Sequence, residues 1–332
     1  MMAAPPIRAG INAVPFRVAD WRQELGFGAR EQDSRGRSIV PDTVSVREAL
    51  RARFPLDAVD QVLAAGDILV PTPNDPARFR RAAARDRLAP GALLYIFRPV
   101  PDEPAEPIEL AVLGRGEHWI AVDKPAGLAS TPQGSHVAQT VTVAARRQFA
   151  NDAIQVAHRL DRLTAGVMLL VTSKEWRGAY QSLFESGAVR KTYQAVAPLS
   201  ARFSRGRWQR VQVRITKPSG SLRAQVTSGA ANAITDVRLA RQVRADGGER
   251  RGIYELRPLT GRTHQLRCTM EYLDAPICGD PLYGQAGKVT HSQEGSLALE
   301  GNLQLLAQSL EFTDPVSGEQ VRLRSALRLP FA

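Results

Sequence analysis

The order of short β-patterned segments after residue 107 is the feature that most constrains the fold of this chain. Strand patterns occur at 118–122, 167–172, 192–197, 208–215, 234–239 and 253–256, and helical patterns near 138–149, 175–186 and 263–273. These patterns follow one another without the regular βαβ alternation that builds a parallel sheet. The sequence therefore predicts an α+β fold.

A stretch rich in proline and acidic residues divides the chain. Residues 99–107 read PVPDEPAEP, and their prolines disfavour regular structure, so we expect a linker. Before it, residues 1 to about 40 show no clear periodicity and predict an irregular lead, whereas 43–70 predict a helix, a turn, a second helix and a short strand. We expect an N-terminal module over 1–98 and a larger domain over 108–332.

The composition is typical of a globular cytoplasmic protein. The 332 residues are 43% hydrophobic, which is enough for a sizeable core. No apolar run approaches the roughly 20 residues that span a bilayer, and the first residues lack the pattern of a secretory signal. Cys268 and Cys278 lack the spacing of a zinc site and are too few for a disulfide framework. We therefore expect a reducing compartment, no structural metal and no membrane association.

The charge of the chain favours a polyanionic partner. The net charge is +11 and the pI is near 10.3, a balance that is common in nucleic-acid-binding proteins. No acidic residue lies between Glu185 and Asp236. Cations that can pair with phosphates, Arg205, Arg207 and Arg210, interleave within this stretch with two aromatic residues, Phe203 and Trp208, whose rings are expected to stack on bases. RNA contact is the favoured interpretation; a solvated basic face or an arginine-rich proteome are the alternatives.

One carboxylate stands among fixed cations in the run 158–166, HRLDRLTAG. Asp161 lies between Arg159 and Arg162, and the apolar residues 167–171 follow at once. An acid flanked by arginines at the start of a buried segment indicates an ionised carboxylate held at a site. A polar turn that leads into a core strand is the simpler structural explanation.

Three further segments concentrate polar residues. Residues 123–128, DKPAGL, end a predicted strand in a Pro/Gly turn. In the predicted strand at 191–193, the side chains of Lys191 and Tyr193 lie on the face opposite Thr192. A lone tyrosine in a strand is usually a core residue. Residues 261–267, GRTHQLR, open a predicted helix, and 276–284, PICGDPLYG, follow it. Such a polar string would be costly to bury unpaired.

The two runs at 158–166 and 261–267 are specific as a pair. Together with the closing run 303–315, they resemble the RluA-type pseudouridine synthase family over about 107–329. The resemblance implies a mixed, mainly antiparallel central sheet flanked by helices and loops. It also implies isomerisation of uridine to pseudouridine in RNA, with no cofactor, metal or energy source.

The resemblance assigns roles to a catalytic set of three residues. Asp161 aligns with the essential aspartate, which assists departure of uracil from C1′ before the base rotates and rejoins through C5. Whether this involves a covalent adduct or charge stabilisation stays open. Tyr193 aligns with a tyrosine that stacks on the target base and is a possible proton acceptor. Arg267 aligns with the arginine that pairs with the aspartate, and bidentate pairing would keep Asp161 ionised and correctly directed.

Further residues are expected to contact the substrate. Arg159 aligns with the side chain that fills the gap left by the flipped nucleotide, and Leu266 is expected to line the uracil pocket. Arg205, Arg207 and Arg210 are expected to contact RNA outside the pocket. The expected partner is structured rRNA or tRNA, the target uridine is not identified, and we expect a monomer without an obligate protein partner.

The chain departs from the family pattern near the expected site. Ala165 stands where serine is more usual, which removes a hydroxyl beside the active loop. Cys268 and Thr269 replace a small apolar residue and a histidine, so the helix after Arg267 is expected to contact RNA differently. Residues 43–70 loosely resemble the small helical RNA-binding module of many family members; a structural cap is the alternative.

Two alternative functions belong to other classes. An RNA-binding protein that has lost activity is disfavoured because Asp161, Tyr193 and Arg267 are all present. A hydrolase with Asp161 as nucleophile would need an imidazole, from His158 or His264, poised near the carboxylate. Histidines in such polar strings are more often structural.

Overall fold

The structure of this chain is a computed structural model. It describes residues 6–18, 43–51, 54, 56–72, 75–89, 91–97, 107–132, 137–244, 248–284 and 302–329. The chain divides into two compact units, Met1–Glu103 and Pro104–Ala332. Residues 99–106 of the predicted linker lie outside the described residues. None of the described helices is long and apolar enough to cross a membrane.

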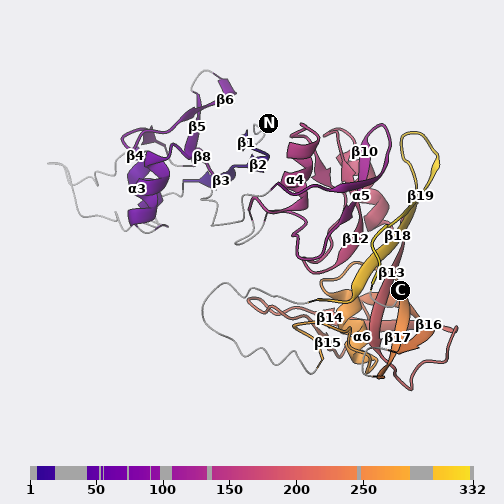
Figure 1. The fold of residues 1–332 in the computed structure, drawn as a ribbon. Coiled ribbons are helices and arrows are strands. Elements are labelled where there is room, and N and C mark those ends of the chain that lie inside the picture. The colour runs from indigo at the N-terminus through magenta and orange to yellow at the C-terminus, as the bar shows by residue number, and fades with distance from the viewer. Residues whose placement is uncertain are drawn as a thin grey trace. The chain divides into compact units, whose positions relative to one another are not determined.

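The described residues of the N-terminal unit form a four-stranded antiparallel sheet, two small ribbons and two short helices (Figure 1). The sheet has the order β3 (Val14–Arg17), β8 (Leu93–Ile96), β5 (Ile68–Thr72) and β6 (Asp75–Arg81). Two small ribbons pair β1 (Ile7–Arg8) with β2 (Ile11–Asn12) and β4 (Val44–Ser45) with β7 (Arg87–Leu88). The helices are α2 (Val46–Arg51) and α3 (Leu56–Ala64).

The described part of 43–70 contains the two helices and the strand that its periodicity predicts, and most of the expected turn between the helices lies outside the described residues. Helix α2 begins at a capping box, in which Ser45 N donates to Glu48 Oε2 at 2.8 Å and Glu48 N donates to Ser45 Oγ at 3.2 Å. The irregular lead is wrong for the part that is described, because β1 to β3 lie within it. Strand β3 is short and contains Pro15, and its partner β8 lies far along the chain. The residues of β3 therefore have no local pattern that predicts a strand.

The larger unit is built on one eleven-stranded sheet. Its strands are β9 (Ala111–Arg115), β10 (Trp119–Lys124), β11 (Gln155–Val156), β12 (Ala165–Val171), β13 (Arg190–Pro198), β14 (Trp208–Thr216), β15 (Gln225–Thr227), β16 (Ala233–Arg244), β17 (Arg250–Pro258), β18 (Leu305–Thr313) and β19 (Gln320–Arg324). The main path runs β15-β14-β16-β17-β13-β18-β12-β10-β9, with β11 paired to β12 and β19 to β18. Only the β12–β18 pair is parallel among the described strand pairs. The predicted α+β fold with a mixed, mainly antiparallel sheet is confirmed.

Three helices of the described residues flank this sheet, α4 (Val141–Gln148), α5 (Arg177–Glu185) and α6 (Gln265–Tyr272), where helical patterns were predicted. Figure 1 shows α4 and α5 near β10 and β12, and α6 near β14 to β17, with β13 and β18 between the two groups. Leu266 and Met270 of α6 pack in the largest core cluster together with Tyr193 and Leu256 of the sheet. The sheet face that carries Tyr193 therefore also carries the helix that holds Arg267.

Gly166 joins the polar run 158–166 to the core at the parallel pair. Its φ is +113°, and a Cβ at this position would lie 2.2 Å from the Ala307 carbonyl oxygen of β18. Only glycine fits both the backbone conformation and the close approach. The glycine that ends the run thus fixes where the preceding loop leaves the sheet.

A buried carboxylate joins both ends of the larger unit. Asp314, which is 5% exposed, accepts hydrogen bonds from Trp119 Nε1 at 2.7 Å and Tyr180 Oη at 2.8 Å. These donors come from β10 and α5, whereas Asp314 directly follows β18. The network therefore ties three distant segments together.

Replacement of Asp314 by Ala should lower the free energy of unfolding by about 3 kcal/mol, because it leaves two buried donors without an acceptor. Urea unfolding followed by circular dichroism measures this change. The matched variant is Asp274→Asn, which removes the charge of an exposed ion pair with Arg202, keeps a side chain that tolerates the φ of +57° at this position, and should cost less than about 1 kcal/mol. Equal losses in the two variants would contradict the structural role of the network.

Candidate active site

Asp161 lies in the loop between β11 and β12, and a buried lysine holds this loop. Lys124, at the end of β10, is fully buried, and its Nζ donates to three carbonyl oxygens: Pro125 at 2.9 Å, Leu128 at 2.7 Å and Arg162 at 2.9 Å. Burial lowers the pKa of Lys124 to about 7, against the nearby Asp161 charge, which raises it. The segment 123–128 is therefore a platform for the residue next to Asp161, a role that its sequence alone does not reveal.

Further hydrogen bonds fix the loop on both sides of the carboxylate. Ser130 Oγ donates to the Leu160 carbonyl at 2.7 Å and accepts from the Leu160 N–H at 3.1 Å. Thr164 N donates to the Asp161 carbonyl at 3.0 Å, and Gly127 N donates to the Arg162 carbonyl at 2.9 Å. The Asp161 backbone is thereby anchored before substrate arrives.

Arg267 contacts Asp161, but its bidentate partner is a different carboxylate. Its Nη1 lies 3.4 Å from Asp161 Oδ2, whereas Nε and Nη2 donate to Asp280 Oδ2 and Oδ1 at 2.7 and 2.6 Å. The expected pairing of Arg267 with Asp161 is present, and the expectation that it is bidentate is wrong. The guanidinium presents two parallel donors to one carboxylate, and Asp280 occupies them.

Asp280 is itself held in a fixed position. Its Oδ1 also accepts from the backbone N–H groups of Leu282 at 2.9 Å and Tyr283 at 3.2 Å, and its side chain is fully buried. Burial disfavours the charge on Arg267, but the hydrogen bonds to Asp280 and the charges of Asp280 and Asp161 outweigh it and raise the pKa of Arg267. Asp280 belongs to the run 276–284, which the sequence singled out without giving this residue a role.

Tyr193 of β13 faces the same site. It is 9% exposed, and its phenol makes no hydrogen bond within the described part of the chain. Burial, and next the Asp161 charge, raise the pKa of Tyr193. The phenol is therefore protonated throughout the neutral pH range and offers an aromatic face and an O–H donor beside Asp161.

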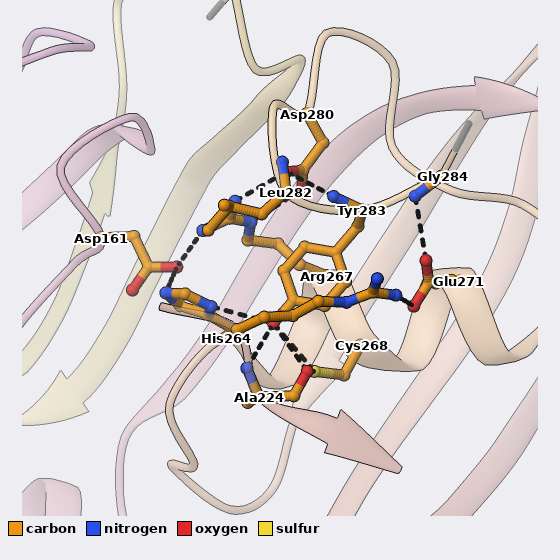
Figure 2. Close-up of polar contacts among 11 residues, drawn as sticks. Asp161, Ala224, His264, Arg267, Cys268, Glu271, Asp280, Leu282, Tyr283 and Gly284 are labelled. Atoms are coloured by element: carbon orange, nitrogen blue, oxygen red, sulfur yellow. Dashed lines mark hydrogen bonds and ion pairs between the residues drawn. The ribbon is translucent and has the colours of Figure 1, made fainter. Parts of the chain in front are cut away.

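His264 lies between Asp161 and Tyr283 (Figure 2). Its Nε2 is 4.0 Å from Asp161 Oδ2, and its Nδ1 is 2.9 Å from the Tyr283 hydroxyl. The Tyr283 ring lies under two guanidinium groups, those of Arg223 and Arg267, each 4.9 Å from its centroid. The run 261–267 and the run 276–284 thus meet around one carboxylate.

His158 is structural. Its Nε2 accepts from the Leu169 N–H at 3.2 Å, and its ring stacks on Phe184 at 4.3 Å between centroids. Desolvation, with help from the Lys191 charge, lowers its pKa to about 3, so the ring is neutral. Its hydrogen bonds, with the Leu169 N–H and with the Arg159 backbone, are both to main chain, so it is not the acid/base that a hydrolase would need.

The remaining predicted contacts divide into three groups. Leu266 is 7% exposed and packs in the core cluster that contains Tyr193, while Arg159 is exposed. Arg205 and Arg207 are exposed in the turn before β14 and form no ion pair within the described part of the chain. Arg210 is instead bidentate to Asp236, at 2.8 and 3.0 Å, which lies opposite it on β16.

The two aromatic residues of the basic stretch are less available than predicted. Phe203 is 8% exposed and packs edge-on against Tyr254, so it is a core residue and the expectation that it stacks on bases is wrong. The Trp208 ring is covered by Arg238 and Arg257, whose guanidinium carbons lie 4.7 and 4.2 Å from its centroid. Stacking of RNA on Trp208 would have to compete with these cations.

Comparison with known proteins identifies the family. Residues 118–272 match the family model described as RNA pseudouridylate synthase. The chain is 30% identical over 302 residues to ribosomal large subunit pseudouridine synthase D of Xanthomonas campestris, covering 86% of this chain and 87% of that protein. It is also 30% identical to the dual-specificity RNA pseudouridine synthase RluA of Vibrio parahaemolyticus, covering 60% of this chain and 76% of that one.

The chain belongs to the RluA-type pseudouridine synthase family. Its fold agrees with that of a solved structure, human RNA pseudouridylate synthase domain containing 1, at a TM-score of 0.51 and 22% identity, over 68% of this chain and 86% of that one. The protein is an enzyme that isomerises uridine to pseudouridine in RNA.

The departures from the family pattern have defined surroundings. Ala165, at the start of β12, packs against the apolar cluster of Val196, Leu306 and Leu329. Cys268 is buried in α6, and its Sγ lies 3.4 Å from the Ala224 carbonyl oxygen and 3.3 Å from the Tyr283 hydroxyl. Its partners are therefore protein groups behind the site. The described residues contain no group of three or more side chains arranged to hold a metal ion.

Substitution of Asp280 by Asn should lower the free energy of unfolding by about 3 kcal/mol, because Arg267 is buried and loses its charged bidentate partner. The rate of pseudouridine formation should also fall at least about 10-fold. Without the charge of Asp280, Arg267 is free to turn toward Asp161 and to pair with both of its oxygens.

The matched variant is Asp236→Asn, which breaks the same bidentate geometry with Arg210 at an exposed position. It should leave the rate of pseudouridine formation unchanged. If Asp280→Asn is as active as Asp236→Asn, the orientation of Arg267 does not depend on Asp280.

Proposed function

We propose that Asp161 is the catalytic carboxylate of this enzyme and acts through Oδ1. The observation that carries the proposal is that both neighbouring nitrogens, Arg267 Nη1 and His264 Nε2, approach Oδ2. Oδ1 forms no hydrogen bond or ion pair within the described residues. Asp161 is also about one-third exposed, whereas the Arg267 side chain is buried. One oxygen is thus held while the other is open to a substrate.

The proposed reaction begins when the target uridine leaves its stack and enters beside Tyr193. Asp161 assists cleavage of the bond between C1′ and N1, either by forming a bond to C1′ or by stabilising the positive charge that develops there. The detached uracil rotates, C5 bonds to C1′ as any bond between C1′ and Asp161 breaks, the proton on C5 leaves, and N1 takes up a proton. Atoms are conserved, so the product has the same mass as the substrate.

Tyr193 is proposed to stack on the uracil during rotation. Because its pKa is raised, a proton acceptor role would require a phenolate that burial and Asp161 both disfavour. Stacking and hydrogen-bond donation are therefore the roles that its surroundings support. Leu266, in the same cluster, is proposed to line the pocket, and Arg159 to enter the gap left by the flipped nucleotide.

The RNA class is proposed from the relatives and the charge. A relative that matches 86% of this chain is named for the ribosomal large subunit, so we propose large-subunit rRNA as the substrate, with tRNA as the alternative outcome. Carbodiimide mapping of pseudouridines in total RNA from cells with and without the gene distinguishes them. The N-terminal unit as an RNA-binding module, a monomeric state without an obligate protein partner, and a cytoplasmic location remain predictions.

The isosteric change Asp161→Asn should abolish pseudouridine formation while RNA affinity stays within about 3-fold, because only the charge of one carboxylate is lost. RNA tritiated at uridine C5 provides the assay, since the label leaves as C5 bonds to C1′. Asp161→Ala should behave likewise. An unchanged rate of tritium release would exclude Asp161 as the catalytic group, and release of free uracil by the wild type would favour the hydrolase.

The double variant Arg205→Gln/Arg207→Gln should weaken RNA binding and flatten its salt dependence by about 1.5 in log K against log salt, as expected for two lost phosphate contacts. Arg210→Gln is the matched control, and it should change the slope by less than half as much, because Asp236 already neutralises Arg210. Filter binding from 50 to 300 mM salt measures both. An unaltered slope in the double variant would place this turn away from the RNA.

A further inference from the structure

The hydroxyl of Tyr283 is the centre of a hydrogen-bond network behind the active site. Ala224 N donates to it at 3.0 Å, the Ala224 carbonyl oxygen lies 3.0 Å away, and His264 Nδ1 lies 2.9 Å away. Cys268 Sγ lies 3.3 Å from the hydroxyl and 3.4 Å from the same carbonyl oxygen. Figure 2 shows these groups on the side of His264 opposite Asp161.

The single proton of the Tyr283 hydroxyl has two acceptors within reach. In the first arrangement the Tyr283 hydroxyl donates its proton to the Ala224 carbonyl, so Nδ1 of a neutral His264 must carry the ring proton. The unprotonated Nε2 then faces the negative Oδ2 of Asp161, which is repulsive. In the second arrangement the Tyr283 hydroxyl donates to Nδ1 of His264, so Nε2 carries the ring proton and the Nε2–H is attracted to Oδ2 of Asp161. In the second arrangement the Cys268 thiol satisfies the Ala224 carbonyl, so every group has a partner.

Nε2 lies 4.0 Å from the carboxylate oxygen Oδ2, and an N–H is attracted to that oxygen whereas a lone pair is repelled, so the geometry favours the second arrangement. Three pKa shifts keep the groups in the protonation states that this arrangement requires. Burial lowers the pKa of His264, with Arg267 and Lys217 lowering it further and Asp161 and Asp280 opposing them, so the neutral ring is favoured. The Cys268 pKa is raised to about 11, chiefly by burial, so the thiol keeps its proton and can donate it. The Tyr283 pKa is also raised, again chiefly by burial, so its hydroxyl is a donor.

The backbone at His264 supports a directed role for the ring. His264 immediately precedes α6 and has a φ of +53°, a left-handed conformation that is uncommon for a residue other than glycine. Its side chain makes no capping hydrogen bond to the helix. The left-handed backbone of His264 is energetically unfavourable, and its ring does not stabilise the end of α6. The conformation instead places the ring in contact with Asp161 and Tyr283.

We propose that His264 is a positioning residue for Asp161, with an Nε2–H that Tyr283 and Cys268 orient toward Oδ2. The 4.0 Å separation closes to a hydrogen bond with a shift of about 1 Å, and such contacts are often long in ligand-free enzymes and tighten with substrate. Arg267 and His264 then hold Oδ2 from two directions and leave Oδ1 for C1′. The inference rests on the proposed role of Asp161.

Rate constants for tritium release, measured with saturating enzyme in excess over C5-tritiated RNA, test the inference. Under these conditions a fraction of misfolded, inactive enzyme does not change the measured rate constant. His264→Ala and His264→Asn should be about 10- to 100-fold slower than wild type, the loss expected for one hydrogen bond to a charged group, with unchanged RNA affinity. His264→Gln places an amide donor near the position of Nε2 and should recover most of the rate. His118→Gln, a histidine that stacks on Trp176 outside the site, should match wild type.

A double-mutant cycle separates positioning from general packing. Tyr283→Phe keeps the ring beside Arg267 and removes only the hydroxyl, so it should slow the reaction about 3- to 10-fold. In the His264→Ala background the same change should have no further effect, because the ring that the hydroxyl orients is gone. Melting temperatures identify any variant that fails to fold.

The inference is wrong if His264→Ala reacts at the wild-type rate, if His264→Gln is as slow as His264→Ala, or if the losses at 264 and 283 are additive. Failure of the proposed function looks different: wild type releases no tritium, or Asp161→Asn still does. A normal His264→Ala rate beside an inactive Asp161→Asn enzyme overturns the role of His264 alone.

Discussion

A single buried guanidinium organises the active site of this enzyme. Arg267 is held by Asp280 through two hydrogen bonds and extends its remaining nitrogen toward Asp161. Because a buried cation requires a paired anion, Asp280 balances the charge of Arg267 without Asp161, the proposed catalytic carboxylate. Asp161 can therefore stay partly exposed and contact Arg267 at one oxygen only. A bidentate Arg267–Asp161 pair would have occupied both oxygens of the carboxylate.

The fold brings these groups together from segments that are far apart in the chain. The loop with Asp161 leaves the sheet beside the parallel pair β12–β18, where Gly166 permits close approach, and Lys124 and Ser130 anchor it from the preceding segment. Helix α6 packs its apolar side on the sheet face that carries Tyr193. Hydrogen bonds to loop backbone and contacts in the core thus hold the site residues together.

Local patterns in the sequence predict most of the larger unit, since its strands and helices have apolar periodicities of their own. The set of Asp161, Tyr193 and Arg267 could also be proposed from the sequence. The two polar runs contain Asp161 and Arg267 and are specific as a pair, and the family that they indicate supplies the role of Tyr193. Short strands such as β3, whose partner β8 lies far along the chain, carry no comparable signal.

Partner choice is what the sequence could not predict. The sequence does not show which carboxylate, Asp280 or Asp161, is the bidentate partner of Arg267. It also does not show that Lys124, which stands at a predicted turn, is buried and bonded to three carbonyl oxygens. The absence of acidic residues between 185 and 236 suggested free cations, but Arg210 pairs with Asp236 across neighbouring strands. These contacts depend on register and burial, which only the folded chain defines.

The most direct test of this account is a crystal structure of the enzyme bound to its RNA with 5-fluorouridine at the target position, where C5 carries no proton to release. The account predicts that Oδ1 of Asp161 faces C1′ of the flipped nucleotide, that Oδ2 stays with Arg267, and that the base lies over Tyr193. A complex in which Arg267 leaves Asp280 to grip both oxygens of Asp161, or in which the base lies away from Tyr193, would contradict it.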